Sequence, residues 1–518
     1  MLARLTPDAR FLPVWLASLT TSVAAPKPFS FDDVIEKARN LAEEAYERPA
    51  PKAALPEPLG ELTYDQYRAI RNRESGRLWK ENSPFRLELI HSGYLFRRPV
   101  MMNEVLPDGT ARRVEFDKER YDYDDLVLEQ QVNWDELKGY AGFRVQFPLN
   151  GSPEQWDEIA SFVGASYFRV LGQDQRWGIS ARALALNVAE PDEKEEFPDF
   201  VEYWLVRPGE DDRQMMIYAL LDSPSVTGAF QMLLVPGVST QVDVNAKLFF
   251  REEVKSLGIA PLTSMFFYGE NSRELHFPGW RPEVHDSDGL LVETEDREML
   301  WRPLSNTRRI RYSAFNTGVA RGYGLLQRDR NFFHYQDLDN PYHKTPSYWI
   351  ETRDGWPKGQ VRLIELPTKY EAFDNIVAFF QPDEMPQVGT GESMDLSYIL
   401  HAKMHFESNL SREHIASTQI GVDDTYPDTR RIVIDFQGPT LESLDRHSQV
   451  YAVIDSTPNG YITENRCFKN EETGGWRVTF KLDTDDNETE PVEMRCFLKL
   501  LPEEKTLTET WTYQWRKN

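Results

Sequence analysis

The segment QVRLIEL, residues 360–366, alternates apolar and polar side chains. Successive side chains of a β-strand point to opposite faces, so this period of two predicts a strand with one buried face. Similar runs are FRLELI (85–90), GFRVQF (142–147) and VDVNA (242–246). Turn-forming pairs separate such runs, among them Asp108-Gly109, Asn150-Gly151, Asp288-Gly289 and Asp354-Gly355. So many strands in one region predict a mostly antiparallel, mostly β fold that closes into a large β-sandwich or barrel.

Helical spacing is confined to short stretches around this β region. Ser30 and the acidic pair Asp32-Asp33 are typical of a helix start, and apolar residues follow at helical spacing up to Ala45. Shorter helices are expected over 64–70 and 153–162. The polar segment 407–429 predicts a domain boundary, which leaves residues 25–407 as the large domain. Residues 428–518 contain short strands and frequent turns, and they predict a small immunoglobulin-like sandwich.

The charge balance narrows the classes of partner. Lys and Arg number 59 against 84 Asp and Glu in 518 residues, which gives a formal net charge of −25. Such a surface repels phosphate backbones, so nucleic acid and anionic membrane surfaces are disfavoured partners. No apolar run long enough to span a membrane follows the N-terminal segment, so no membrane span is expected in the mature protein.

The N-terminus and the cysteines bear on the compartment. Arg4 and Arg10 accompany an apolar stretch that ends in Ser22-Val23-Ala24, and this pattern predicts a secretory signal peptide over residues 1–24. The two cysteines, Cys467 and Cys496, would be able to pair in an oxidising compartment. Two separate buried thiols are the alternative.

The motifs for cofactors and metals are absent or weak. No glycine-rich phosphate loop follows a predicted strand, so no nucleotide cofactor is expected. His401 and His405 have helical metal-ligand spacing, but on a strand they would stand about 13 Å apart, too far to share an ion. The run Asp286-Ser287-Asp288-Gly289 resembles part of a calcium loop without its remaining ligands. We therefore expect neither a cofactor nor a metal.

The segment 276–374 is rich in carboxylates, aromatic rings and guanidinium groups. Such a mixture is typical of a polysaccharide cleft, because rings stack on sugar faces and two carboxyls can act as general acid and general base. Plainer interpretations remain open: Asp288 in a hairpin turn, Asp374 before a strand, and Arg328-Asp329-Arg330 as a surface ion-pair cluster. Candidate substrate-binding residues in this segment are Asp288, Trp301, Arg328 and Tyr335.

Several long motifs in a fixed order resemble one family. They include FSFDDV (29–34), GASYFR (164–169), WGISAR (177–182), LGIAPLTSMF (257–266), EVHDSDGL (283–290), GLLQRDR (324–330) and DNIV (374–377). With these motifs the chain resembles the periplasmic osmoregulated glucan biosynthesis proteins, the G and D members of one family. The resemblance implies a galactose-mutarotase-like β-sandwich followed by an immunoglobulin-like domain, a periplasmic location, and β-1,2-linked glucan as ligand.

The resemblance also implies an activity and its residues. It is that of an inverting endo-β-1,2-glucanase with Asp374 as general acid and Asp286 as general base, and with Tyr342 and Glu371 near the substrate. Asp288 remains an alternative base, because a turn breaks the alternation of a strand. Ala372 and Phe373 stand where the family pattern leads us to expect more polar residues.

Other activities stay open at this point. The chain could be a β-1,2-glucan transglycosylase, or a non-catalytic glucan-binding factor that works beside a membrane glucosyltransferase. A sugar epimerase on the same fold is a weaker alternative.

Overall fold

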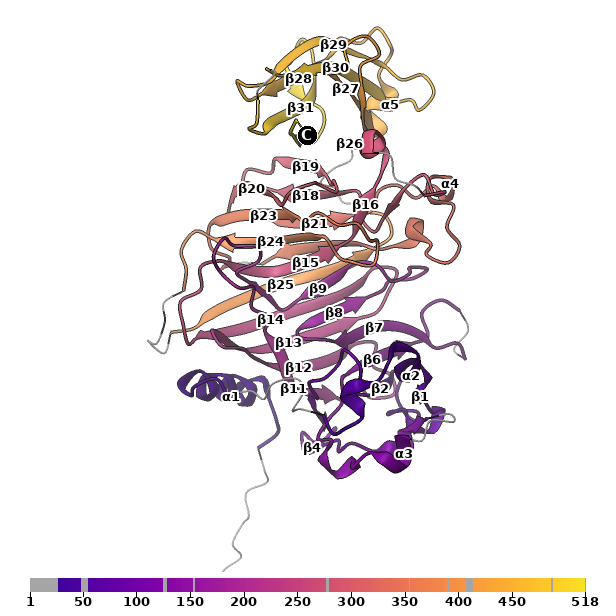
Figure 1. Ribbon diagram of the computed structural model, residues 1–518, viewed down its shortest axis with the longest axis vertical. Coiled ribbons are helices and arrows are strands. Elements are labelled where there is room, and N and C mark those ends of the chain that lie inside the picture. The colour runs from indigo at the N-terminus through magenta and orange to yellow at the C-terminus, as the bar shows by residue number, and fades with distance from the viewer. Residues whose placement is uncertain are drawn as a thin grey trace, which may run out of the picture.

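The computed structural model describes residues 27–47, 55–123, 128–151, 154–275, 279–353, 355–386, 388, 392–406, 413–485 and 488–517. The predicted signal peptide, residues 1–24, lies outside the described residues. In the described part, β-strands dominate and form two large sheets stacked as a sandwich (Figure 1). The fold is therefore mostly β, as the alternating sequence predicts.

The first large sheet has ten strands among the described residues. Its order is β2-β6-β7-β8-β9-β15-β24-β23-β20, with β10 paired to β15. The strands are β2 (Arg86–Ile90), β6 (Gly142–Phe147), β7 (Asp157–Val163), β8 (Tyr167–Val170), β9 (Ser180–Arg182), β10 (Leu184–Leu186), β15 (Leu257–Ser264), β20 (Arg311–Gly318), β23 (Gly359–Glu365) and β24 (Ile376–Pro382). The segment QVRLIEL supplies most of β23. The helix expected over 153–162 is wrong, because Asp157–Val163 pairs with β6 and β8 and this pairing overrides the local helical pattern.

The second large sheet has fifteen strands in the described part, in the order β28-β31-β33-β19-β18-β21-β22-β25-β14-β13-β12-β11-β3-β4 with β32 beside β31. Its strands before residue 300 are β3 (Met101–Val105), β4 (Ala111–Arg113), β11 (Asp199–Val206), β12 (Met215–Asp222), β13 (Val226–Val235), β14 (Thr240–Phe250), β18 (Gly289–Glu293) and β19 (Met299–Pro303). The later ones are β21 (Gly322–Leu326), β22 (Ser347–Thr352), β25 (Met394–Lys403), β28 (Val450–Ser456), β31 (Val492–Leu500), β32 (Lys505–Thr506) and β33 (Thr510–Trp515).

The two sheets enclose one continuous apolar core. Side chains from both sheets meet there, and buried tyrosines tie the layers together. The Tyr348 hydroxyl on β22 donates to the carbonyl of Val170 on β8 at 2.7 Å, and the Tyr323 hydroxyl on β21 lies 2.8 Å from two carbonyl oxygens of β15. These hydrogen bonds satisfy hydroxyls that would be costly to bury alone.

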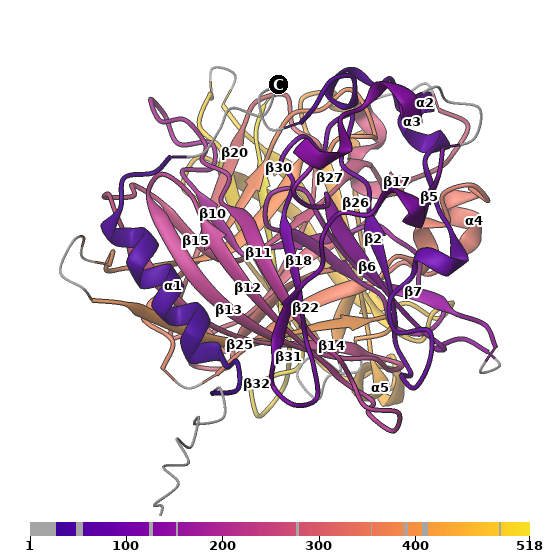
Figure 2. The same cartoon turned by 90° about the horizontal axis from the view of Figure 1, so that it is seen from below.

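Helix α1 (Phe31–Glu43) packs on the outer face of the second sheet, against β12, β13 and β14 (Figure 2). Ser30 and Asp33 form the capping box that the sequence predicts. The expected helix near residue 64 is α2 (Tyr64–Ala69). Further short helices are α3 (Leu128–Gln131), α4 (Phe332–Tyr335) and α5 (Pro439–Ser443), with 3-10 turns η2 (Leu59–Glu61), η3 (Glu74–Gly76), η4 (Lys118–Arg120), η5 (Trp134–Glu136), η6 (Glu270–Leu275) and η7 (Tyr342–Lys344). Two small sheets pair β1 (Arg71–Asn72) with β5 (Tyr121–Asp122) and β16 (Phe266–Tyr268) with β17 (Val284–His285).

The C-terminal strands form a second, smaller sandwich at one end of the molecule (Figure 1). One layer is β26 (His414–Val422), β27 (Arg430–Gln437), β30 (Trp476–Asp483) and β29 (Tyr461–Lys469), and the other is β28, β31 and β33. The second layer continues the large sheet, because β33 runs parallel to β19 with Trp511 opposite Trp301. Strand β26 lies inside the polar segment 407–429, of which residues 407–412 are outside the described part.

The two cysteines do not form a disulfide, and His401 binds a carboxylate. Cys467 on β29 and Cys496 on β31 are free thiols, and burial raises the pKa of Cys467 to about 12. His401 lies on strand β25, as the strand interpretation required, with its Nε2 2.8 Å from a Glu351 oxygen. Among the described residues, no helix is long and apolar enough to cross a membrane.

Candidate active site

Asp286 and Asp374 lie close to each other although 88 positions of sequence separate them. Asp286 follows β17, and its backbone N–H donates to the Met265 carbonyl at 2.8 Å. Asp374 precedes β24. The next residue, Asn375, accepts a hydrogen bond from the N–H of Phe266 at 2.8 Å. The segment 265–266 therefore binds Asp286 and also Asn375, the residue that follows Asp374.

A close backbone approach completes this arrangement. A Cβ on Gly178 would lie 2.7 Å from Oδ1 of Asp286 and 2.4 Å from Cγ2 of Thr345. Only glycine fits there without a shift of its neighbours. The Thr345 hydroxyl lies 3.4 Å from the same Asp286 oxygen, the only hydrogen bond that the structure gives to this carboxylate among the described residues. Asp286 is thus enclosed but weakly bonded.

The electrostatics of this pair raise both pKa values. Burial, followed by the charge of Asp374, raises the pKa of Asp286 to about 7, against the opposing influence of Arg169, His285 and Thr345. Burial also raises the pKa of Asp374, whose side chain is 35% exposed, and the charge of Arg169 opposes this. Arg169 Nη2 lies 4.0 Å from Asp374 Oδ2. Because the pKa of Asp286 is about 7, the pair holds part of a proton near neutral pH.

Tyr342 and Glu371 border the same carboxylates. Tyr342 is 6% exposed, and burial followed by the charges of Asp286 and Glu371 raises the pKa of its hydroxyl, which therefore stays a neutral donor. Glu371 is bound by Arg281, whose Nη1 also donates to Asp337 at 2.9 Å. This guanidinium fixes Glu371 at the border of the site as a paired carboxylate.

The other four residues predicted from the sequence are held by hydrogen bonds or ring contacts within the protein. The Asp288 carboxylate accepts the backbone N–H groups of Arg328 and Asp329. Tyr335 is fully buried, and its hydroxyl accepts from Gln327 Nε2 at 2.9 Å. Trp301 is 3% exposed beneath the guanidinium of Arg328, whose carbon is 3.5 Å from the ring centre. Trp301 and Arg328 pack against the C-terminal sandwich, whereas the Tyr335 ring lies 6.0 Å from the Tyr342 ring. Because two backbone N–H groups bind the Asp288 carboxylate, the geometry favours Asp286 over Asp288 as the partner of Asp374.

Three residues of the site are not among the candidates predicted from the sequence. Arg169 faces both aspartates, Thr345 contacts Asp286, and Asn375 holds the segment that carries Asp374. Arg169 and Asn375 stand in the quoted motifs GASYFR and DNIV, which was the available signal. Their roles depend on contacts between distant strands, which spacing alone does not report.

One group of side chains in the described part has metal-ligating atoms within 4.8 Å of one another: Glu283, Asp329 and His334. These atoms already have partners. His334 Nδ1 binds an Asp329 oxygen, and Glu283 Oε2 lies 3.0 Å from His285 Nε2. The group is therefore explained by internal hydrogen bonds, and the site chemistry described above does not involve it.

Comparisons with known proteins identify the family. The family model described as "Periplasmic glucan biosynthesis protein, MdoG" matches residues 29–515. Proteins named "Glucans biosynthesis protein G" are similar along nearly their whole length. The Pseudomonas paraeruginosa protein is 41% identical over 505 residues, covering 95% of this chain and 94% of its own. The Serratia proteamaculans protein is 40% identical over 516 residues, covering 96% of each chain. This chain belongs to the MdoG family of periplasmic glucan biosynthesis proteins.

Proposed function

We propose that this chain acts in the periplasm on β-1,2-linked glucan, as an inverting endo-β-1,2-glucanase. Membership of a glucan biosynthesis family supports glucan as the ligand class. The observation that carries the enzymatic part is the pair Asp286 and Asp374, two neighbouring carboxyls whose pKa values are both raised. Glycosidic cleavage needs one protonated and one ionised carboxyl at the same pH, and this pair can supply both.

In this proposal Asp374 is the general acid and Asp286 the general base. The partly exposed Asp374 protonates the leaving glycosidic oxygen as the bond from the anomeric carbon breaks. A water molecule attacks that carbon from the opposite face, and its proton passes to Asp286 directly or through one hydroxyl. A base with a pKa of about 7 is partly ionised at neutral pH and still accepts a proton readily.

Arg169 favours a second candidate with the two roles exchanged. Its guanidinium is 4.0 Å from Asp374 and stabilises the ionised form of that carboxyl, as a base requires. The more deeply buried Asp286 would then hold the proton of the acid. In the first assignment, the substrate must offset the influence of Arg169 on Asp374.

The first experiment incubates the purified protein with linear β-1,2-glucan and resolves the products by size and by anomeric configuration. We expect shorter chains whose newly formed ends have the inverted configuration. Asp374→Asn and Asp286→Asn should each lower the turnover by about 10²–10⁴-fold. Asp211→Asn, at an exposed aspartate, is the matched control and should leave the turnover unchanged.

The other outcomes each contradict the proposal in a defined way. Longer, cyclic or rearranged products would make the chain a transglycosylase. Binding of the glucan without turnover would favour a non-catalytic assembly factor beside a membrane glucosyltransferase. Full activity in both Asn variants would exclude the aspartate pair.

A second experiment separates the two role assignments. A β-1,2-gluco-oligosaccharide with fluoride as the leaving group needs little help from a general acid. We expect Asp374→Asn to retain much of its activity on this substrate, and Asp286→Asn to recover activity when azide replaces water as the nucleophile. The opposite pattern would assign the acid to Asp286.

A further inference from the structure

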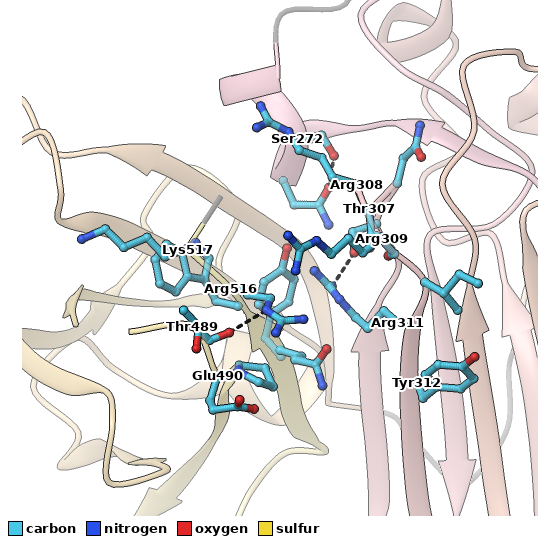
Figure 3. Close-up of a pocket in the computed structure, with 18 of the residues that line it drawn as sticks. Ser272, Thr307, Arg308, Arg309, Arg311, Tyr312, Thr489, Glu490, Arg516 and Lys517 are labelled. Carbon is cyan, nitrogen blue, oxygen red and sulfur yellow. Dashed lines mark hydrogen bonds between the residues drawn. The ribbon is translucent and has the colours of Figure 1, made fainter. Parts of the chain in front are cut away.

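A polar cavity of about 860 Å³ lies at the junction of the two sandwiches (Figure 3). We call it the junction cavity. One side is the segment 305–312 that leads into β20, and the other is the end of β33 with residues 488–491. The carboxylates of the candidate active site do not line it. Its occupant therefore does not depend on the proposed glucanase activity.

Several neutral polar side chains of the junction cavity already have hydrogen-bond partners within the protein. Asn306 donates to two carbonyl oxygens and accepts the N–H of Thr368. The Ser305 hydroxyl donates to Glu365 and accepts from Arg311, whose charge Glu365 also balances. Gln514 Nε2 donates to Glu493 at 2.6 Å. Hydrogen bonds within the protein thus occupy these three side chains, which leaves fewer groups for a neutral sugar.

Three guanidinium groups in the cavity are left without a carboxylate. Arg308 and Arg309 are exposed, and no carboxylate oxygen of a described residue lies within 4.0 Å of either guanidinium. Arg516 donates its Nε to the Thr489 carbonyl at 2.8 Å and likewise forms no ion pair within the described part. Figure 3 shows Arg308 and Arg309 extending from one side of the cavity and Arg516 from the other.

This concentration of positive charge runs against the rest of the molecule. The whole chain carries a formal net charge of −25, yet the lining contains five basic and two acidic residues. One of the two acids, Glu488, has its Oε1 2.6 Å from the backbone N–H of Glu490. Neighbouring guanidinium groups repel each other unless an anion lies between them.

We propose that the junction cavity binds an oxyanion, the phosphate or carboxylate group of a ligand, between Arg308 and Arg309 on one side and Arg516 on the other. Guanidinium groups match both oxyanions because they donate paired, charge-assisted hydrogen bonds. An anion held from both sides would join the loop before β20 to the last strand of the chain. Its binding would therefore stabilise the contact between the two sandwiches.

The test is calorimetric titration of the full chain with inorganic phosphate and, separately, with citrate, at constant ionic strength set with NaCl. We expect saturable binding of at least one anion, and the stronger of the two identifies the ligand group. The double variant R308Q/R309Q and the single variant R516Q should each weaken binding at least tenfold, which is about 1.4 kcal/mol. R213Q, at an exposed arginine outside the cavity, should bind as the wild type does.

Thermal unfolding without added anion supplies a second measurement, which does not depend on how tightly the anion binds. Without an anion, R308Q/R309Q should raise Tm, because it relieves repulsion; a merely structural role for these two arginines would lower Tm instead. With saturating phosphate or citrate, this order should reverse. R516Q is unsuited to this comparison because it also loses the hydrogen bond to the Thr489 carbonyl. No binding above the NaCl control, equal binding in all variants, or a lower Tm for anion-free R308Q/R309Q would each overturn the proposal.

Discussion

Asp286 and Asp288 are separated by a single residue, yet they belong to two different regions of the molecule. In the described structure, Asp286 accepts one long hydrogen bond and faces another carboxylate. Asp288 accepts two backbone N–H groups and lies beside His285, with Nε2 and Oδ1 3.7 Å apart. The difference teaches that burial alone does not make a carboxylate reactive, because hydrogen-bond donors decide whether its charge is satisfied.

The same contrast extends to the surroundings of each aspartate. Beyond Asp288, Arg328 stacks on Trp301 and binds Glu509 through two hydrogen bonds of 2.5 and 3.0 Å. Glu509 also accepts the N–H of Ile415 at 2.8 Å. Arg328 and Glu509 thus balance each other's charge, whereas the nearby charge of Asp374 raises the pKa of Asp286. We therefore expect substitutions at the ion pair of Arg328 and Glu509 to change stability most, and substitutions at the aspartate pair to test the proposed chemistry.

The largest expected effect on stability comes from breaking the buried ion pair of the junction. Glu509→Gln leaves the Arg328 guanidinium without its counter-charge, and it should lower the free energy of unfolding by about 3–5 kcal/mol. Arg353→Gln breaks an exposed pair with Asp243 and should cost about 0–1 kcal/mol. Urea unfolding of both variants measures the difference. Equal losses would show that Glu509 contributes no more than a surface charge.

Asp286→Asn should change stability in the opposite direction, and only at higher pH. The pKa of Asp286 is about 7 in the folded protein, above its ordinary value of 3.8, so the folded state binds a proton more tightly than the unfolded state. That contribution to stability is present below about pH 4 and is lost as the pH rises through 7. The variant should therefore be more stable than the wild type at pH 8, and the advantage should shrink towards pH 4.

Asp288→Asn is the matched control for this measurement. A neutral amide oxygen replaces the charged Oδ2 that accepts both N–H groups, which weakens two charge-assisted hydrogen bonds, so this variant should be less stable than the wild type throughout pH 5–8. Thermal unfolding across this pH range compares the three proteins. A pH-independent difference for Asp286→Asn would contradict the raised pKa of Asp286.

The sequence predicted the sheets better than the site. The alternation of apolar and polar residues predicted β23 and β6 directly, because it reflects the buried face of each strand. It did not reveal that Asp286 and Asp288 diverge, because the turn between β17 and β18 breaks the alternation. It also placed Trp301 and Arg328 among the sugar-binding candidates, whereas both pack against the C-terminal sandwich. That contact depends on β19 pairing with β33 about 210 residues later, which no local pattern reports.

The smallest expected effect concerns Phe373, the residue before Asp374. Its ring is 61% exposed and meets Tyr370 edge to face at 6.0 Å between ring centres. An exposed aromatic pair beside the candidate acid offers a face for a sugar ring, and such contacts are worth about 0.5–1.5 kcal/mol. Phe373→Ser should therefore raise KM for β-1,2-glucan by about 2–10-fold and leave kcat nearly unchanged. A fall in kcat with unchanged KM would instead mean that Phe373 acts on the protonation of Asp374, because its apolar ring keeps water away from that carboxyl.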